Sequence, residues 1–264
     1  MTSITRGHKI YFAAVGLLAL SVGFTGYFLP AQVEIALPWF VPPLHARFLG
    51  AMYLSGTVFM LGAVRARQWA EVWVIMPMIV IWTGLLFVVS SLHLAEFDFA
   101  IPQTWVWFSA YLIYPLIALW LAIRYRPAGN APAGPALPSW ASNALLALGV
   151  LTSVPALALL FLPGMMAAVW PWTITPLLAH LYSAPFLSYG IGSLLLARCK
   201  TWSEVRISVT AIFVFALGVL LASLLHRQLF APAVLADWLW FGSFSVAVIL
   251  TALLALRARS SARP

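Results

Sequence analysis

The sequence predicts an all-α integral membrane protein, with eight transmembrane helices arranged as two parallel four-helix repeats. Composition is the first reason. Of the 264 residues, 64% are hydrophobic and only 8% are charged, whereas a soluble domain carries about 25% charged residues. So few charged side chains cannot cover a surface that faces water. The other two reasons are the lengths of the apolar runs and their recurrence in two halves of the chain.

An internal repeat divides the chain. Residues 10–126 and 143–259 match in one constant register and without a gap, so that residue 10 aligns with residue 143. The matched residues include Phe28, Pro30, Trp69, Glu71, Ser90, His93 and Trp107 in the first copy, and Phe161, Pro163, Trp202, Glu204, Ser223, His226 and Trp240 in the second. A register of this length predicts a tandem duplication. We therefore expect a first four-helix repeat over residues 1–126 and a second over residues 143–264.

Each repeat contains four apolar runs of the length that crosses a bilayer, which is about 20 residues. The predicted spans are residues 10–29, 48–64, 72–92 and 105–123 in the first repeat, and 143–163, 177–197, 207–225 and 238–256 in the second. Residues 127–142, between the repeats, are rich in Pro, Gly and Ala. Prolines and small residues oppose a continuous helix, so this segment is predicted to be a linker.

The distribution of basic residues predicts the orientation. An even number of spans per repeat returns the chain to its starting side, so the two repeats are parallel. The basic residues on that side are Arg6, Lys9, Arg65, Arg67, Arg124, Arg126, Arg198, Lys200, Arg206, Arg257, Arg259 and Arg263. Only Arg47 and Arg227 fall on the other side. Because cytoplasmic loops carry the excess of Lys and Arg, both termini are predicted to be cytoplasmic.

The net charge and the loop lengths also predict the partners and the type of membrane. The net charge of +8 is part of the topology signal, and it favours contact with lipid headgroups over binding of nucleic acid. The short loops indicate a bacterial-type plasma (inner) membrane, with the lipid bilayer as the main partner and other subunits of a membrane complex as a further possibility. We find no GxSxG motif, no P-loop and no GxGxxG motif after a strand, which favours a non-enzymatic role.

Two further patterns concern packing. Tryptophans fall near the predicted span ends: Trp39, Trp105, Trp107, Trp170, Trp172, Trp238 and Trp240 on the outer side, and Trp69 and Trp202 on the inner side. We interpret them as interfacial anchors. Small residues recur at a spacing of four in the second span of each repeat, as Ala51 and Ser55 and as Ala184 and Ser188. This spacing permits close helix contact, so these two spans are expected to line the contact between the repeats.

Polar residues are predicted to gather at the outer face. A helical hairpin returns to its starting side, so the start of the second span and the end of the third lie at the same face. The expected neighbours are His45 and Arg47 with His93 and Glu96 in the first repeat, and His180 with His226 and Arg227 in the second. Together they form the candidate ligand-binding site.

Three interpretations of this cluster stay open. In the first, the residues are interfacial, with His93 and His226 capping helix C-termini and Arg47 pairing with Glu96 or Asp98. In the second, they form a polar pocket for a small ligand or a lipid headgroup. In the third, His93 and His226 bind haem or a metal ion, although neither an HExxH motif nor a pair of carboxylates accompanies them.

These observations favour two functions over the others. In the first, the protein binds or passes a small neutral or apolar solute, with the outer cluster as the entry site. No Asp, Glu, Lys or Arg lies near the middle of a predicted span, which argues against a proton-coupled carrier. In the alternative, the chain is a non-catalytic subunit or scaffold of a larger membrane complex. A haem- or metal-binding membrane protein is third.

Overall fold

The computed structural model describes residues 3–39, 41–125, 134–231 and 233–260. The long helices are α1 (Arg6–Phe28), α2 (Pro43–Arg65), α3 (Ile75–Leu92), α4 (Pro102–Arg124), α5 (Ser139–Phe161), α7 (Pro176–Leu196), α8 (Trp202–Leu225) and α9 (Leu235–Ser260). The short ones are η1 (Pro30–Ile35), η2 (Trp69–Glu71), η3 (Leu94–Glu96), α6 (Pro163–Val169) and η4 (Arg227–Leu229). The all-helical fold class is therefore confirmed for the described residues. Residues 127–133 of the predicted linker lie outside them.

Local sequence explains where several helices begin. Pro43, Pro102 and Pro176 each stand at the first position of a helix, where the missing N–H of proline would have no helical partner in any case. Thr5 caps α1, because its side chain accepts a hydrogen bond from the N–H of His8. Helix starts also recur in the register of the sequence repeat, because the first residues of α1, α2 and α4 align with the first residues of α5, α7 and α9.

Seven helices of the described chain are long and apolar enough to cross a membrane: α1, α2, α3, α4, α5, α8 and α9. The predicted span over residues 177–197 corresponds to α7, a helix of 21 residues that does not reach the same hydropathy. Its sequence explains the difference, because Ser183, Ser188 and Ser193 are buried in α7 together with Tyr182 and Tyr189. The structure thus supports seven of the eight predicted spans by length and composition.

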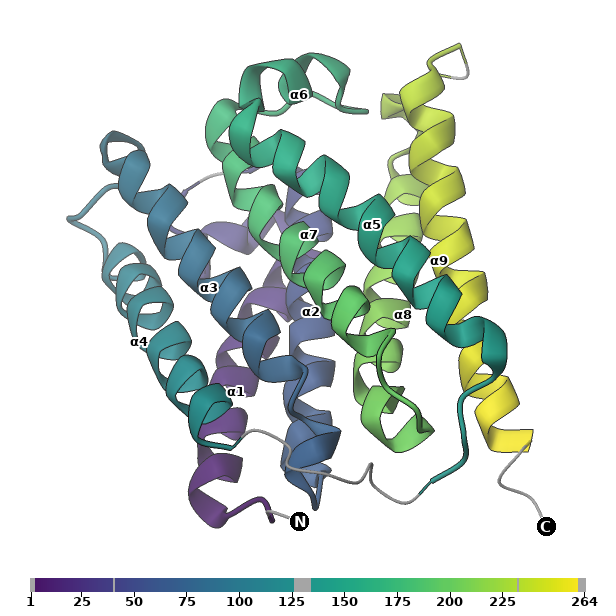
Figure 1. The fold of residues 1–264 in the computed structure, drawn as a ribbon. Helices are drawn as coiled ribbons and strands as arrows, with labels where there is room; N and C mark the ends of the chain where they lie inside the picture. The colour runs from purple at the N-terminus through teal and green to yellow at the C-terminus, as the bar shows by residue number, and fades with distance from the viewer. Residues whose placement is uncertain (1–2, 40, 126–133, 232, 261–264) are drawn as a thin grey trace.

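The helices form a central group and a peripheral group (Figure 1). In the centre, α2 packs against α8, and α3 packs against α7. Each central helix carries one peripheral helix: α1 on α2, α4 on α3, α5 on α7 and α9 on α8. Both chain ends lie at the same end of the bundle (Figure 1). We call this the proximal end, and the opposite end the distal end.

The small residues of α2 and α7 lie at close helix contacts between the two halves of the chain, as expected. The hydroxyl of Ser55 on α2 donates to the carbonyl of Ala211 on α8 at 2.7 Å. Likewise, Ser188 on α7 donates to the carbonyl of Met78 on α3 at 2.8 Å. Each of these two helices therefore packs its backbone against a helix of the other half. A side-chain contact also connects α2 to α7, where the hydroxyl of Tyr189 donates to Ser55 at 2.8 Å.

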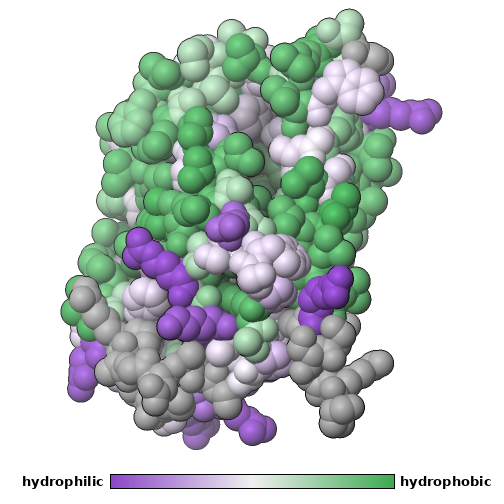
Figure 2. Space-filling model, turned by 45° about the vertical axis from the view of Figure 1, so that its right-hand side comes forward, coloured by the Kyte–Doolittle hydropathy of each residue, from purple (hydrophilic) through white to green (hydrophobic). Residues whose placement is uncertain are grey.

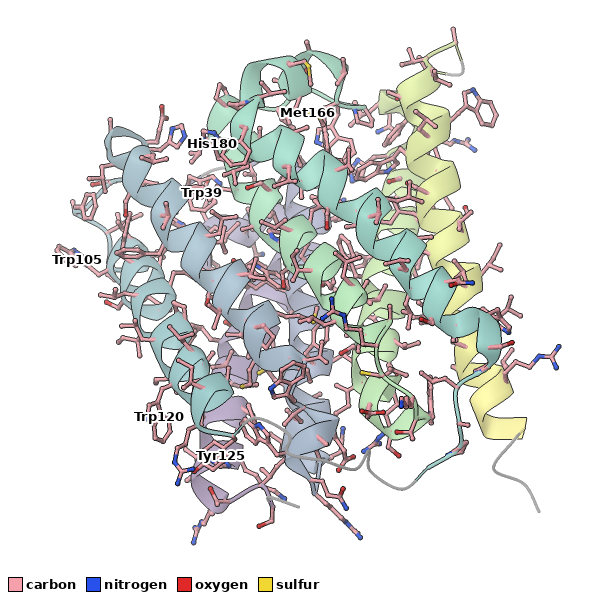
Figure 3. All side chains as sticks on the ribbon, viewed as in Figure 1. Trp39, Trp105, Trp120, Tyr125, Met166 and His180 are labelled. Carbon is pink, nitrogen blue, oxygen red and sulfur yellow. The ribbon has the colours of Figure 1, made fainter. Side chains whose placement is uncertain are left out.

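Several tryptophans predicted to be interfacial are core residues instead. Trp69 is buried in the turn after α2. Trp107 and Trp240 are only 7% exposed, and their indole N–H groups donate to the buried hydroxyls of Ser90 and Ser223 at 2.9 Å in both cases. Trp105, by contrast, is 59% exposed and points away from the bundle (Figure 3). The prediction failed for the buried rings because a tryptophan near a span end can face either the lipid or the neighbouring helices.

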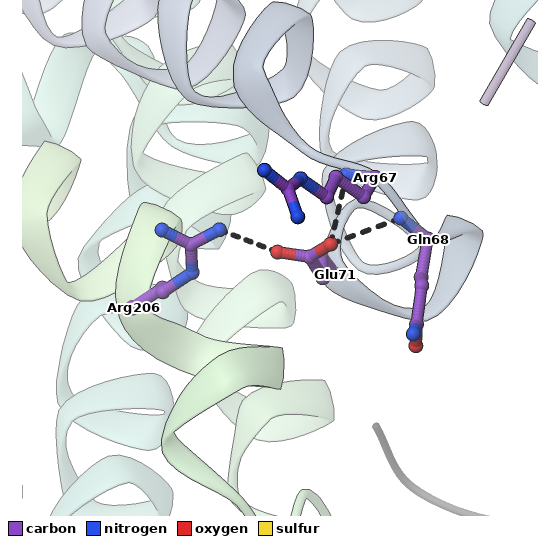
Figure 4. A network of polar contacts seen from close by, with 4 residues as sticks. All are labelled: Arg67, Gln68, Glu71 and Arg206. Carbon is purple, nitrogen blue, oxygen red and sulfur yellow. Dashed lines mark hydrogen bonds and ion pairs between the residues drawn. The ribbon is translucent and has the colours of Figure 1, made fainter. Parts of the chain in front are cut away.

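An ion pair joins the two halves at the proximal end. The carboxylate of Glu71 accepts hydrogen bonds from the backbone N–H groups of Arg67 and Gln68 at 2.9 Å, and it forms an ion pair with Arg206 of α8 (Figure 4). Burial raises the pKa of the Glu71 carboxyl, but the hydrogen bonds from Arg206, Gln68 and Arg67 outweigh burial, so the pKa lies below its ordinary value. These contacts attach the turn after α2 to α8 of the second half.

Elsewhere, the surface suits a lipid environment. Figure 2 shows hydrophobic residues over most of the visible face, with most of the hydrophilic side chains gathered in its lower half, toward the proximal end.

Candidate functional site

The structure joins the predicted polar residues across the two halves rather than within them. Arg47 of α2 donates from Nη1 to Nε2 of His226, at 2.6 Å, where His226 follows α8. His93, which follows α3, forms a hydrogen bond through Nε2 with Nδ1 of His180 on α7 at 2.7 Å. We call these two contacts the distal pairs. They are equivalent in the sequence repeat, because Arg47 aligns with His180 and His93 aligns with His226.

The expected pairing within each repeat was wrong for a physical reason. It assumed that the second and third spans of a repeat pack as a hairpin, whereas α2 packs against α8 and α3 packs against α7. The ends of the paired helices therefore come from opposite halves. For the same reason, Arg47 meets His226 and not Glu96 or Asp98.

The other predicted residues have separate environments. His45 is buried, and its Nδ1 lies 2.9 Å from the hydroxyl of Tyr182. Glu96 and Arg227 are exposed on the short helices η3 and η4. Figure 3 shows His180 at the distal end of the bundle. The seven residues thus form two hydrogen-bonded pairs, one buried histidine and two exposed charges.

The distal pairs have limited capacity for a metal ion. Within the described residues, no three His, Cys, Asp or Glu side chains come close enough together to hold one. His93 and His226, the predicted ligands, belong to different pairs, and each is the residue that ends a helix. Burial lowers the pKa of His226, and the nearby charge of Arg47 lowers it further. A neutral imidazole at His226 accepts the hydrogen bond from the arginine.

A second feature was not predicted: a cavity of about 530 Å³ within the first half of the chain. Helices α1, α2, α3 and α4 line it, together with Ile35 of η1 and Ser188 of α7. Ser21 and Val106 are both exposed side chains of its lining. The cavity is therefore accessible from the face between α1 and α4, the helices that carry these two residues.

Most of the lining is apolar, but polar groups interrupt it. Four hydroxyls in the lining already donate to backbone carbonyls of helices, namely those of Ser21, Thr25, Thr83 and Ser188. Two tyrosine hydroxyls, from Tyr53 on α2 and Tyr111 on α4, form a buried hydrogen bond with one another. The side-chain oxygen of Gln103 is buried without a hydrogen-bond partner in the described structure. Within the described chain, the hydroxyl of Tyr114 and the indole N–H of Trp82, which also line the cavity, have no hydrogen bond either. The tyrosine pair, Gln103, Tyr114 and Trp82 thus carry the polar groups with capacity for a further hydrogen bond.

The second half of the chain replaces this polar lining with apolar residues. At the matched positions, Phe186 stands for Tyr53 and Phe244 for Tyr111. Ala236, Ala247, Ala158 and Ala216 stand for Gln103, Tyr114, Thr25 and Thr83. Gly56 of the cavity corresponds to Tyr189, whose ring stacks on Phe215 with centroids 4.8 Å apart. The fold itself therefore does not require the hydroxyls of the first half, and these substitutions are the sequence signal that would have revealed the cavity.

Comparisons with protein-family models, with curated proteins and with solved structures find no match for this chain. The class is defined by the structure itself: in the described part of the chain, seven helices have the length and apolar composition of membrane spans. This is the character of a multi-pass membrane protein associated with the lipid bilayer.

Proposed function

We propose that the protein binds a small neutral or apolar solute in the cavity of its first half. The cavity carries this proposal: its volume of about 530 Å³ falls in the range of small-molecule sites, about 300–1,000 Å³, and such sites combine apolar walls with few polar groups. No Asp, Glu, Lys or Arg is among its lining residues, so a charged ligand would be desolvated there without a counter-charge. Access between α1 and α4 would admit the solute from the bilayer.

We further propose that the chain is a tandem duplication with α7 as an eighth span. The support is the constant register of the repeat, which recurs in helix bounds and in specific contacts. The indole–serine bonds of Trp107 and Trp240 are one such matched set, at 2.9 Å each. Another is at the proximal end, where the N–H of Ile4 donates to the carbonyl of Arg67, and that of Leu137 to Lys200. The second repeat would therefore begin near residue 136 rather than at 143.

The proposed orientation places the proximal end, with both termini, in the cytoplasm of a cell with a bacterial-type plasma membrane. The excess of Arg and Lys near the proximal ends of the helices supports it through the positive-inside rule. Under this proposal the distal pairs face the outside. Because their members bond to one another across the two halves, they favour a role in holding the halves together, and a ligand role for the seven polar residues stays a prediction.

A cavity-filling variant tests the proposed function. A Cβ added at Gly56 would lie 3.8 Å from Cβ of Ala19 and 4.0 Å from the ring of Trp82, which are ordinary contacts. Gly56→Leu should therefore fold and place an apolar side chain inside the cavity, which leaves less room for a solute. Gly242→Leu is the matched control, because a Cβ there meets nothing within 4 Å.

The measurement is mass spectrometry of compounds extracted from each purified protein. We expect one lipid-soluble compound enriched over the surrounding membrane in the wild type and in Gly242→Leu, and depleted in Gly56→Leu. Recovery of membrane lipids alone, in the same proportions from all three proteins, would contradict the proposal.

A further inference from the structure

The Tyr53–Tyr111 pair has one hydroxyl proton more than its own hydrogen bond uses. In a bond between two hydroxyls, one O–H donates and the other accepts, so the proton of the accepting hydroxyl still needs an acceptor. Within the part of the chain that the structure describes, the hydroxyls of Tyr53 and Tyr111 have no hydrogen bond besides the one between them. Both side chains line the cavity, so the spare proton is available to whatever occupies it.

The position of the pair restricts the occupant. Tyr53 and Tyr111 lie near the middle of α2 and α4, two helices of 23 residues that are long enough to cross a membrane. The ester groups of a phospholipid stay near the bilayer surface, outside the hydrocarbon core. An oxygen that reaches this pair must therefore belong to a molecule that is apolar as a whole.

The walls around the pair are aromatic. Trp82 and Trp107 line the cavity beside the tyrosines, with ring centroids 6.0 Å apart for Tyr53 and Trp82 and 4.4 Å apart for Trp107 and Tyr111. The indole N–H of Trp107 is already used by Ser90. These rings suit the faces and edges of an unsaturated or ring-bearing molecule.

From this geometry we infer that the cavity selects a neutral, lipid-soluble molecule carrying a carbonyl oxygen, such as an aryl ketone or a quinone, which accepts a hydrogen bond from the Tyr53–Tyr111 pair. The inference rests on the proposed function and adds the chemical class of the ligand. The second half of the chain supports it, because the matched positions hold Phe186 and Phe244. A fold that tolerates phenylalanine at both positions retains buried hydroxyls in the first half for a reason other than folding.

The experiment uses benzophenone, a photoreactive aryl ketone, on the full-length protein in lipid nanodiscs. Labelled peptides are mapped by mass spectrometry, and the benzophenone concentration that gives half-maximal labelling is measured. Four proteins are compared: the wild type, the double variant Tyr53→Phe/Tyr111→Phe, Gly56→Leu and Tyr189→Phe. Tyr189→Phe is the matched control, because it removes a buried hydroxyl that bonds to Ser55 and does not line the cavity. Diphenylmethane, which has the same two rings but no carbonyl, serves as competitor.

We expect labelling of residues that line the cavity in the wild type and in Tyr189→Phe, with no such labelling in Gly56→Leu. The double variant should need about a fivefold higher benzophenone concentration, the effect of one net hydrogen bond. Diphenylmethane should compete weakly in the wild type and better in the double variant, where the carbonyl gives no advantage.

Two different failures are distinguishable. If Gly56→Leu abolishes labelling but the double variant labels like the wild type, the cavity binds apolar molecules without using the tyrosines, and this inference falls while the proposed function stands. If lining residues are never labelled and Gly56→Leu changes nothing, the proposed function falls as well.

Discussion

The strongest prediction about the fold concerns Ser90 and Ser223, which hold equivalent buried tryptophans in the two halves. The indole N–H of Trp107 donates to Ser90, and that of Trp240 to Ser223, each at 2.9 Å. Ser90→Ala or Ser223→Ala would leave a buried N–H without an acceptor. Such a loss costs about 1–3 kcal/mol, and both serines are 0% exposed, so water cannot replace the hydroxyl without rearrangement. We expect each variant to lose about this much stability, and the two losses to be similar.

The assay is unfolding in mixed detergent micelles by titration with a denaturing detergent, followed by circular dichroism. Ser109→Ala, at an exposed position of α4, serves as the control and should leave stability unchanged. Because the two sites lie in opposite halves and share no partner, the losses should add in the double variant. The reasoning is refuted if both serine variants unfold like the wild type, or if only one of them is destabilised by more than the control.

Three further predictions follow from single contacts. A Cβ at Gly50 would lie 2.8 Å from the carbonyl carbon of Gly26 on α1, so Gly50→Ala should push these helices apart and cost about 1–3 kcal/mol in the same unfolding assay; an unchanged midpoint would contradict this packing. Glu71→Gln removes the charge that pairs with Arg206. It should lower the free energy of unfolding by roughly 1–2 kcal/mol at neutral pH, a value reduced by the partial exposure of the arginine. Equal stability of the variant and the wild type would show that the ion pair contributes nothing. His226 has a pKa below its ordinary value of 6.5, so as the pH falls the imidazole is protonated in the unfolded chain before it is protonated in the folded protein. The free energy of unfolding should therefore decrease as the pH drops below about 6.5. His226→Gln should show a smaller decrease between pH 7.5 and 5.5, and an identical decrease would exclude His226 as a cause of the pH dependence.

The elements of the fold could be predicted from the sequence because membrane helices are fixed mainly by composition and length. The packing of one helix on another could not. Helices that are apolar all round carry little signal for the face that each neighbour contacts, so α2 was expected to pair with α3, whereas it packs against α8. The repeat alignment did contain a signal. Arg47 aligns with His180, and His93 aligns with His226. Each distal pair combines one member of the first aligned couple with one member of the second.

The residues that line the cavity were not predicted from the sequence either. Charged and histidine residues stand out in an apolar sequence, and the site predicted from the sequence, at the distal end, consists of such residues. The cavity is lined instead by residues that look ordinary in a membrane helix, such as Gly56 and Tyr53. Only the comparison of the two halves distinguishes these residues from ordinary packing residues. Where one copy has tyrosine and the other has phenylalanine, both rings can pack in the same way, but only the tyrosine can form a hydrogen bond through its side chain.

The most direct test of the central claim, that the first half holds a small molecule, is native mass spectrometry of the protein released from a mild detergent. The account predicts the bare chain or a homo-oligomer of it, carrying one defined added mass of a small lipid-soluble compound, and loss of that mass in Gly56→Leu. A wild-type protein without any added mass, or one that carries other protein subunits in fixed proportion and no small molecule, would contradict the account and favour a scaffold within a membrane complex.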